Sequence, residues 1–123
     1  MLLLTKKIRE KLLDNDQRHG HDHIPVLKLF DPSGAATWLF TELQPDGDTL
    51  FGLCDLGFGL PEIGYASLNE ITKIRGPFGL PIERDLYFET SKPLSIWASH
   101  AREAGRIEEP PPRKSASPSA KAA

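Results

Sequence analysis

Two runs of alternating side chains, joined by a short turn, constrain the fold more than any other feature of this sequence. Residues 37–43 and 49–55 alternate as β-strands do, and each is rich in large apolar residues. The five residues between them include Pro45 and Gly47, which favour a tight turn. The pattern therefore predicts an antiparallel hairpin. Strict alternation places Trp38, Phe40 and Glu42 on one face of its first strand and Leu39, Thr41 and Leu43 on the other.

The remaining segments predict helices and further strands around this hairpin. Leu4, Ile8 and Leu12 recur every four residues, which is typical of an amphipathic helix. Ser67 followed by Glu70 matches a capping box that opens a second helix. We expect helices over 5–13, 68–74 and 91–105, strands over 26–30 and 86–88, a polar loop over 14–25 and an ordered glycine-rich loop over 57–65.

Together these segments predict an α+β fold in a single domain that spans residues 1–104. We expect a small antiparallel β-sheet of about four strands, packed with roughly two to three helices. Residues 105–123 are rich in proline, serine, alanine and lysine and have few apolar side chains. Because such a segment cannot bury enough surface to offset the entropy of ordering, we predict a disordered tail.

Composition narrows the class of protein. With 123 residues, 39% hydrophobic and 26% charged, the chain has the composition of an average soluble domain. Its one cysteine, Cys54, excludes an intrachain disulfide and is predicted to be a small buried residue of a strand. No stretch approaches the roughly 20 apolar residues of a membrane span, and charges follow Leu4 too soon for a signal peptide. We therefore expect a cytoplasmic protein with no membrane partner.

The most site-like segment is the histidine loop, residues 19–23, which contains His19, His21, Asp22 and His23. Three imidazoles and a carboxylate are suitable ligands for zinc, nickel or copper. Structural metal sites usually draw ligands from two segments, however, and the remaining histidine, His100, lies on the predicted last helix. We predict an exposed loop with no metal and no cofactor, and keep surface metal binding and a functional metal site as alternatives.

Other catalytic patterns are weaker in this sequence. Gly57, Gly59 and Gly64 lack both the spacing of a dinucleotide-binding loop and the lysine of a P-loop. Several carboxylates offer pairs for acid–base chemistry, but their separation and burial are not determined by the sequence; they are Asp46, Asp48, Asp55, Glu62, Glu83 and Asp85. A metal-dependent or carboxylate-based hydrolase therefore stays an alternative to a non-enzymatic protein.

Three consecutive charged residues, Glu83, Arg84 and Asp85, lie between apolar segments and allow two interpretations. The simpler one is an internal salt bridge from Arg84 to a neighbouring or distant acid. The other is a recognition surface, since arginine and tyrosine are common anchors of protein interfaces. The partner-binding candidates on that interpretation are Arg75, Arg84, Tyr87 and Tyr65.

Four stretches of the chain resemble a bacterial family catalogued as domain of unknown function 2958. They are residues 4–6 (LTK), 51–53 (FGL), 61–70 (PEIGYASLNE) and 75–88 (RGPFGLPIERDLYF), and the similarity covers roughly residues 2–100. The resemblance implies a small accessory protein carried by plasmids, integrative elements and phage-related regions. It implies no activity, cofactor or catalytic residue, and the histidine loop and the tail after Gly105 lie outside the four matching stretches.

These observations favour a non-enzymatic protein-binding accessory factor of a bacterial mobile element. We expect its partner to be a host or defence protein, whose complex it inhibits or modulates. The net charge is −2, and because four cations and two acids follow from Arg106 onward, the preceding residues carry −4. Nucleic-acid binding is a distant third hypothesis, supported only by basic residues of the first helix and the tail. The sequence leaves the oligomeric state open.

Overall fold

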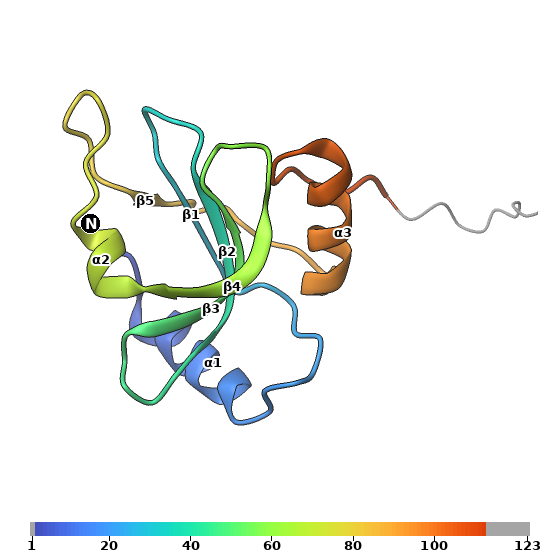
Figure 1. Cartoon of the computed structure of the whole chain (residues 1–123). Coiled ribbons are helices and arrows are strands. Elements are labelled where there is room, and N and C mark those ends of the chain that lie inside the picture. Colours follow the sequence, from blue (N-terminus) through green and yellow to red (C-terminus); the bar gives the residue numbers. More distant parts are fainter. Residues whose placement is uncertain (1, 113–123) are drawn as a thin grey trace, which may run out of the picture.

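The computed structural model describes residues 2–112, which form an α+β fold (Figure 1). Along the described chain the elements are α1 (Lys6–Asp16), β1 (Leu27–Phe30), β2 (Thr37–Leu43), β3 (Thr49–Asp55), β4 (Glu62–Ser67), α2 (Leu68–Thr72), β5 (Glu83–Arg84) and α3 (Leu94–Ala104). The five strands form one antiparallel sheet in the order β4-β3-β2-β1-β5. The predicted fold class is confirmed, with one strand more than expected.

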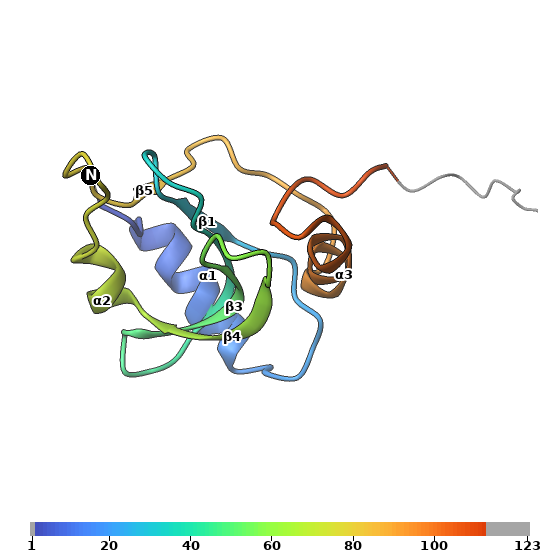
Figure 2. The ribbon, with the colours of Figure 1, turned by 45° about the horizontal axis from the view of Figure 1, so that its top comes forward.

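The sheet is covered by α1 on one face and by α3 on the other (Figures 1 and 2). On the α1 side, Leu12 packs against Trp38 and Phe40 of β2. On the α3 side, Trp97 packs with Leu39, the residue between those two. The strand β2 is therefore buried on both faces, as its apolar residues predict.

The ends of the helices follow the predicted capping residues. The Thr5 hydroxyl accepts a hydrogen bond from the amide of Ile8, and the Ser67 hydroxyl accepts one from the amide of Glu70, both at 3.1 Å. The last helix ends at Gly105, which has the left-handed conformation (φ 78°) that favours glycine. The first helix continues to residue 16, into the predicted polar loop. Among residues 2–112, no helix is long and apolar enough to cross a membrane.

A β-bulge in β2 overturns the predicted alternation of this strand. Phe40 pairs with Gly52 and Glu42 with Phe51, so that Thr41 is an extra residue between them. The faces are exchanged beyond the bulge, and Leu43 joins Phe40 in the core under α1. Glu42 therefore faces the α3 side, opposite to the face on which strict alternation placed it.

Two further strands differ from prediction. The segment predicted as a glycine-rich loop overlaps most of β4, which pairs with β3 along its whole length and forms one edge of the sheet. The prediction of a strand over 86–88 is wrong: residues 86–87 form a turn, and the strand of this segment is β5, two residues long and earlier in the chain. The amide of Tyr87 donates to the Asp85 carboxylate at 2.9 Å, which turns the backbone away from the sheet.

The chain after α3 folds back onto the domain. The amide of Ile107 donates to the buried carboxylate of Asp55 at 3.0 Å, and the Ile107 side chain packs against the α3-side core. His100 Nε2 lies 2.8 Å from a Glu108 carboxylate oxygen, and Pro110 is buried. The folded part therefore extends beyond the predicted boundary at residue 104. The tail prediction for 113–123 lies outside the described residues.

Candidate functional site

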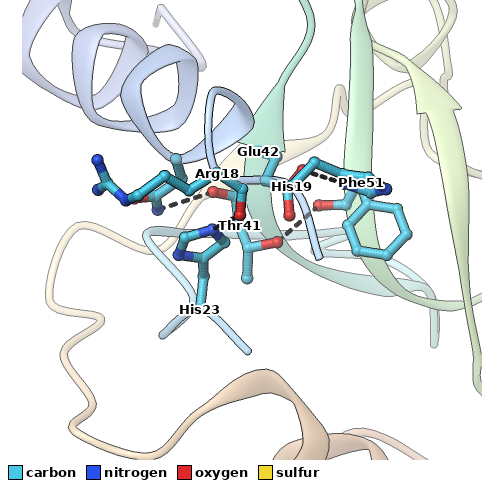
Figure 3. Close-up of polar contacts among 7 residues, drawn as sticks. Arg18, His19, His23, Thr41, Glu42 and Phe51 are labelled. Atoms are coloured by element: carbon cyan, nitrogen blue, oxygen red, sulfur yellow. Dashed lines mark hydrogen bonds and ion pairs between the residues drawn. The ribbon is translucent and has the colours of Figure 1, made fainter. Parts of the chain in front are cut away.

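A contact between a strand carboxylate and a loop histidine is the most unusual polar feature of the described chain. The side chain of Glu42, on β2, is 1% exposed, and that of His19, in the loop after α1, is 52% exposed. Their Oε1 and Nδ1 atoms are 2.6 Å apart (Figure 3). This short separation is typical of a charge-assisted hydrogen bond, in which the imidazole donates to the carboxylate.

The loop that carries His19 is held at both ends. Near its start, the Asn15 side chain donates to the carbonyl of the bulge residue Thr41 at 3.0 Å (Figure 3). Near its end, the Asp22 carboxylate accepts a hydrogen bond from the amide of Ser95 at 3.0 Å, at the start of α3. The histidine loop is thus held between the sheet and α3, and residues 19–22 are exposed, as predicted.

The second oxygen of the Glu42 carboxylate is buried and has no hydrogen-bond donor among the described residues. A buried acceptor without a donor costs free energy, so such groups are rare in folded proteins. The hydrogen bond from His19 to Glu42, together with the negative charge of that carboxylate, raises the pKa of His19 above its ordinary value. The pair therefore consists of an imidazole that is readily protonated and a carboxylate with one oxygen that accepts no hydrogen bond from the described residues.

The pair opens into a pocket between the histidine loop, the sheet and α3. The pocket has a volume of about 500 Å³, within the size range of small-molecule sites. The Phe51 ring of β3 contacts the His19 ring edge-on, with centroids 5.3 Å apart. The rest of the lining combines the apolar side chains of Ile63, Leu94 and Ala98 with polar or charged ones, which are His21, Asp22, His23, Thr41, Ser95 and Arg102.

The three imidazoles of the loop have separate contacts. His19 binds Glu42, whereas His23 Nε2 donates to the Arg18 carbonyl at 2.9 Å, and His21 stacks on His23 with ring centroids 5.9 Å apart. Within residues 2–112, no group of three or more histidine, cysteine, aspartate or glutamate side chains is arranged to hold a metal ion.

The partner-binding candidates occupy different places. Tyr65 lies on the edge strand β4, 56% exposed, and its ring packs on Phe51 with centroids 5.0 Å apart. Tyr87 is 91% exposed and follows β5, the strand at the other edge of the sheet. Together with Arg84 it lines a second cavity of about 550 Å³. Arg75 donates to backbone carbonyls at the end of α2. The four residues therefore do not form one surface.

Arg84 makes neither of the salt bridges considered for it. Its guanidinium donates to the carbonyl of Leu2 at 2.6 Å, and so ties β5 to the segment before α1. The neighbouring Asp85 instead pairs with Lys28, at 3.6 Å. A structural role for Arg84 is supported, with a different partner from the predicted acids.

Besides Asp85, three of the carboxylates considered for acid–base chemistry have structural contacts, namely Asp46, Asp48 and Asp55. Asp46 accepts hydrogen bonds from two amides and a hydroxyl of the β2–β3 turn, which lower its pKa. Asp48 accepts from the hydroxyl of Ser67 and the amide of Asn69, at the start of α2. Asp55 accepts from the amides of Gly57 and Ile107.

Large apolar side chains are exposed on two loops at one end of the sheet. Phe58 is 82% and Phe78 81% exposed. We call this set the apolar loop surface; it comprises Leu56, Phe58, Leu60, Phe78 and Leu80. Both loops flank the turn between β1 and β2, which contains Ser33 and Ala35 (Figure 1). In the first loop, a methyl group added to Gly57 would lie 3.0 Å from Ala35. In the second, one added to Gly76 would collide with Ser33.

The thiol of Cys54 lies on β3 and is half-buried. Burial raises its pKa to about 11, so that the reactive thiolate is scarce near neutral pH. The side chain is half-buried rather than fully buried as predicted, and its raised pKa favours a structural residue over a nucleophile.

The fold and these sites can be compared with known proteins. The model of the family described as protein of unknown function DUF2958 matches residues 3–108, which is most of the chain. The chain belongs to the DUF2958 family. No curated protein and no solved structure matches it. This match agrees with the resemblance seen in the sequence. The family description names no function, so the geometry of the site is the basis for a function of this DUF2958 chain.

Sequence reasoning missed Glu42 as a candidate. The available signal was a single acidic residue within the apolar strand 37–43, a position that normally holds an apolar side chain. The signal for its partner was the histidine loop. Its three imidazoles suggest metal ligands more directly than a hydrogen-bond donor to a distant carboxylate.

Proposed function

We propose that this DUF2958 chain is a non-enzymatic accessory factor of bacterial mobile elements that acts by binding another protein. The partner in this proposal is a host protein, such as a component of a defence complex, whose action the accessory factor inhibits or modulates. The observation that carries the proposal is the apolar loop surface, with phenylalanines more than four-fifths exposed on the two loops that flank the β1–β2 turn (Figure 1).

Exposure of this kind favours a binding role on physical grounds. Single exposed apolar residues are common, but several large ones on adjoining loops are typical of interaction sites. Aromatic rings contribute strongly to interfaces because they bury much area and have few rotatable bonds. The glycines of these loops, Gly57 and Gly79, have positive φ angles, so the loops follow paths that suit glycine and present the intervening side chains outward.

The mobile-element setting and the defence-related partner rest on the family resemblance, to which the charge of the chain adds weak support. An acidic chain is not attracted to nucleic acid by its overall charge, which leaves a protein as the better partner. Tyr87 and Tyr65, both exposed, can extend the contact beyond the apolar loop surface.

The proposal is tested by affinity purification of the full chain from a bacterial host, followed by mass spectrometry. Three forms are compared: the natural chain, the double variant Phe58→Ser with Phe78→Ser, and the control Ile96→Ser. Ile96 is 46% exposed on α3 and lies outside the apolar loop surface. We expect one recurrent protein with the natural chain and the control, reduced at least about tenfold with the double variant.

Two outcomes count against the proposal. Recovery of no protein above background would remove the binding function itself. Equal recovery with the natural chain and the double variant would remove the apolar loop surface as the site. Circular dichroism of the double variant checks that both changes, at exposed positions, leave the fold intact.

A carboxylate-based hydrolase is the second candidate, and the observation that favours it is the pair of His19 and Glu42. A histidine oriented by a buried carboxylate is a common arrangement for general base catalysis. Hydrolysis of model esters or amides that is lost in both His19→Gln and Glu42→Gln would support this candidate. Rates equal to the buffer alone would exclude those substrates.

A further inference from the structure

We propose that the pocket above Glu42 binds an organic cation, an alkylammonium or alkylguanidinium group, through the carboxylate oxygen that His19 does not use. This inference concerns a different part of the molecule from the apolar loop surface and does not depend on the proposed function.

The first argument is the hydrogen-bonding state of Glu42. Its Oε1 atom accepts from His19 at 2.6 Å, whereas its buried Oε2 atom has no donor among the described residues. Glu42 is among the residues that line the pocket, and its unused oxygen is shielded from solvent, so an N–H group bound there must displace part of the lining to reach that oxygen. A donor that carries positive charge is favoured, because hydrogen bonds between ionised groups are about twice as strong as neutral ones.

The second argument is the chemistry of the walls. The ring of Phe51 lines the pocket beside the carboxylate, and the face of an aromatic ring attracts ammonium and guanidinium groups. Ile63, Leu94 and Ala98 provide apolar surface for a short alkyl chain. A cationic head and an apolar stem together match both parts of the lining.

The third argument is the balance of charge around Glu42. The basic residues of the lining are His19, His21, His23 and Arg102, and Asp22 brings negative charge that is already engaged with Ser95. Arg102 is exposed, so water and salt screen its repulsion of a cation, whereas the buried carboxylate is screened little. An anion would have to lie against that carboxylate and is disfavoured.

The same chemistry can come from a free amine or from a lysine or arginine side chain of a peptide. The pocket volume of about 500 Å³ admits either. The experiment below therefore includes an arm for each source.

The test is a titration of the ¹⁵N-labelled natural chain, followed by NMR. The probes are n-butylammonium and n-butylguanidinium, with 1-butanol and butyrate as uncharged and anionic controls. We expect saturable shifts of the Glu42 and Ala98 amides and of the His19 ring with the two cations only. His100, which pairs with Glu108 and does not line the pocket, is an internal control and should not shift.

Matched variants locate the binding. Glu42→Gln should weaken binding of the cations at least tenfold, whereas Glu62→Gln, which changes an exposed carboxylate of β4, should leave it unchanged. A thermal melt of each variant checks folding, and if Glu42→Gln does not fold, the natural-chain titration decides alone. No shift with either cation, equal shifts with 1-butanol, or unchanged affinity in a folded Glu42→Gln would each overturn the proposal.

A second arm distinguishes the sources of the cation. Capped tripeptides with a central lysine or arginine are titrated beside the free amines. Peptide binding as tight as that of the amines assigns the pocket to a basic side chain. Binding of the amines at least tenfold tighter than the peptides assigns it to a small molecule.

Discussion

His19 Nδ1 lies 2.6 Å from Oε1 of Glu42, across 23 residues of sequence, and the contact joins the loop after α1 to the bulged part of β2. Its two members differ in environment, because the imidazole is half exposed and the carboxylate is buried. Burial of a carboxylate costs free energy that one hydrogen bond does not fully return. The pair is therefore better explained by binding or chemistry at the pocket than by stability.

The first prediction concerns the stability of Glu42→Leu. Replacement of a buried ionised group by an apolar one of similar size is often neutral or stabilising, and His19 can turn to solvent when its partner is removed. We expect the free energy of unfolding to stay within about 1 kcal/mol of that of the natural chain, or to rise. Urea denaturation measures it. A loss of more than about 3 kcal/mol would assign Glu42 a structural role instead.

The second prediction concerns pH. Since Glu42 raises the pKa of His19 in the folded state, the protonated imidazole stabilises the fold. This contribution is fully present below the ordinary pKa of histidine, about 6.5, and is lost as pH rises through the higher folded value. The difference in unfolding free energy between the natural chain and His19→Gln should therefore be larger at pH 5.5 than at pH 8.5.

A double-mutant cycle provides the control for this pH effect. In the Glu42→Gln background the cause of the raised pKa is removed, so His19→Gln should have nearly the same effect at both pH values. A pH dependence that persists in that background would show that another group, such as the neighbouring Asp16, controls His19.

The third prediction concerns the glycine opposite the bulge. A methyl group on Gly52 would collide with the carbonyl oxygen of Leu39 and lie 2.8 Å from the Cα of Phe40, so glycine permits the close approach of β3 to β2. Gly64, on β4, pairs directly with Gly52. A methyl group added to Gly64 would have no atom within 4 Å. We expect Gly52→Ala to cost about 2–4 kcal/mol and Gly64→Ala less than about 1, measured by chemical denaturation.

The hairpin was predictable because its signals are local. The strands β2 and β3 have the predicted bounds, 37–43 and 49–55, since alternation and a proline–glycine turn act within a dozen residues. The end of α3 at Gly105 was predictable for the same reason, because only the adjacent backbone determines a helix cap.

The bulge and the site were not predictable in this way. The register shift after Phe40 depends on how Gly52 fits against β2, and local alternation contains no sign of it. The contact of His19 with Glu42 depends in turn on that shift, which turns the glutamate toward α3. The strand β4 was missed because Gly64 within it and Pro61 just before it are unfavourable for a strand locally, whereas pairing with β3 stabilises residues 62–67 as a strand.

The fourth prediction concerns the reactivity of Cys54. With a pKa of about 11, its thiolate fraction at pH 8 is about one in a thousand, whereas an unfolded cysteine with a pKa of about 8.5 is roughly one quarter ionised. We expect iodoacetamide to modify the folded protein at least about a hundredfold more slowly than the urea-unfolded protein. Mass spectrometry follows the reaction. Similar rates in both states would contradict a buried, unreactive thiol.

The last prediction concerns Asp55, whose carboxylate is 2% exposed and accepts hydrogen bonds from the amides of Gly57 at 2.9 Å and Ile107 at 3.0 Å. Asp55→Ala leaves two amides without their acceptor, which should cost about 2–3 kcal/mol. It should also release the segment after α3, so that hydrogen exchange at Ile107 becomes faster. The control Glu62→Ala, at an exposed position, should change stability by less than about 0.5 kcal/mol.

The two measurements on Asp55 separate a structural carboxylate from a catalytic one. Lower stability with rapid exchange at Ile107 is the result expected of a group that fastens the C-terminal segment to β3. Unchanged stability and a protected Ile107 amide would instead return Asp55 to the set of candidate catalytic carboxylates, because a buried acid that costs nothing to remove has no structural reason to be there.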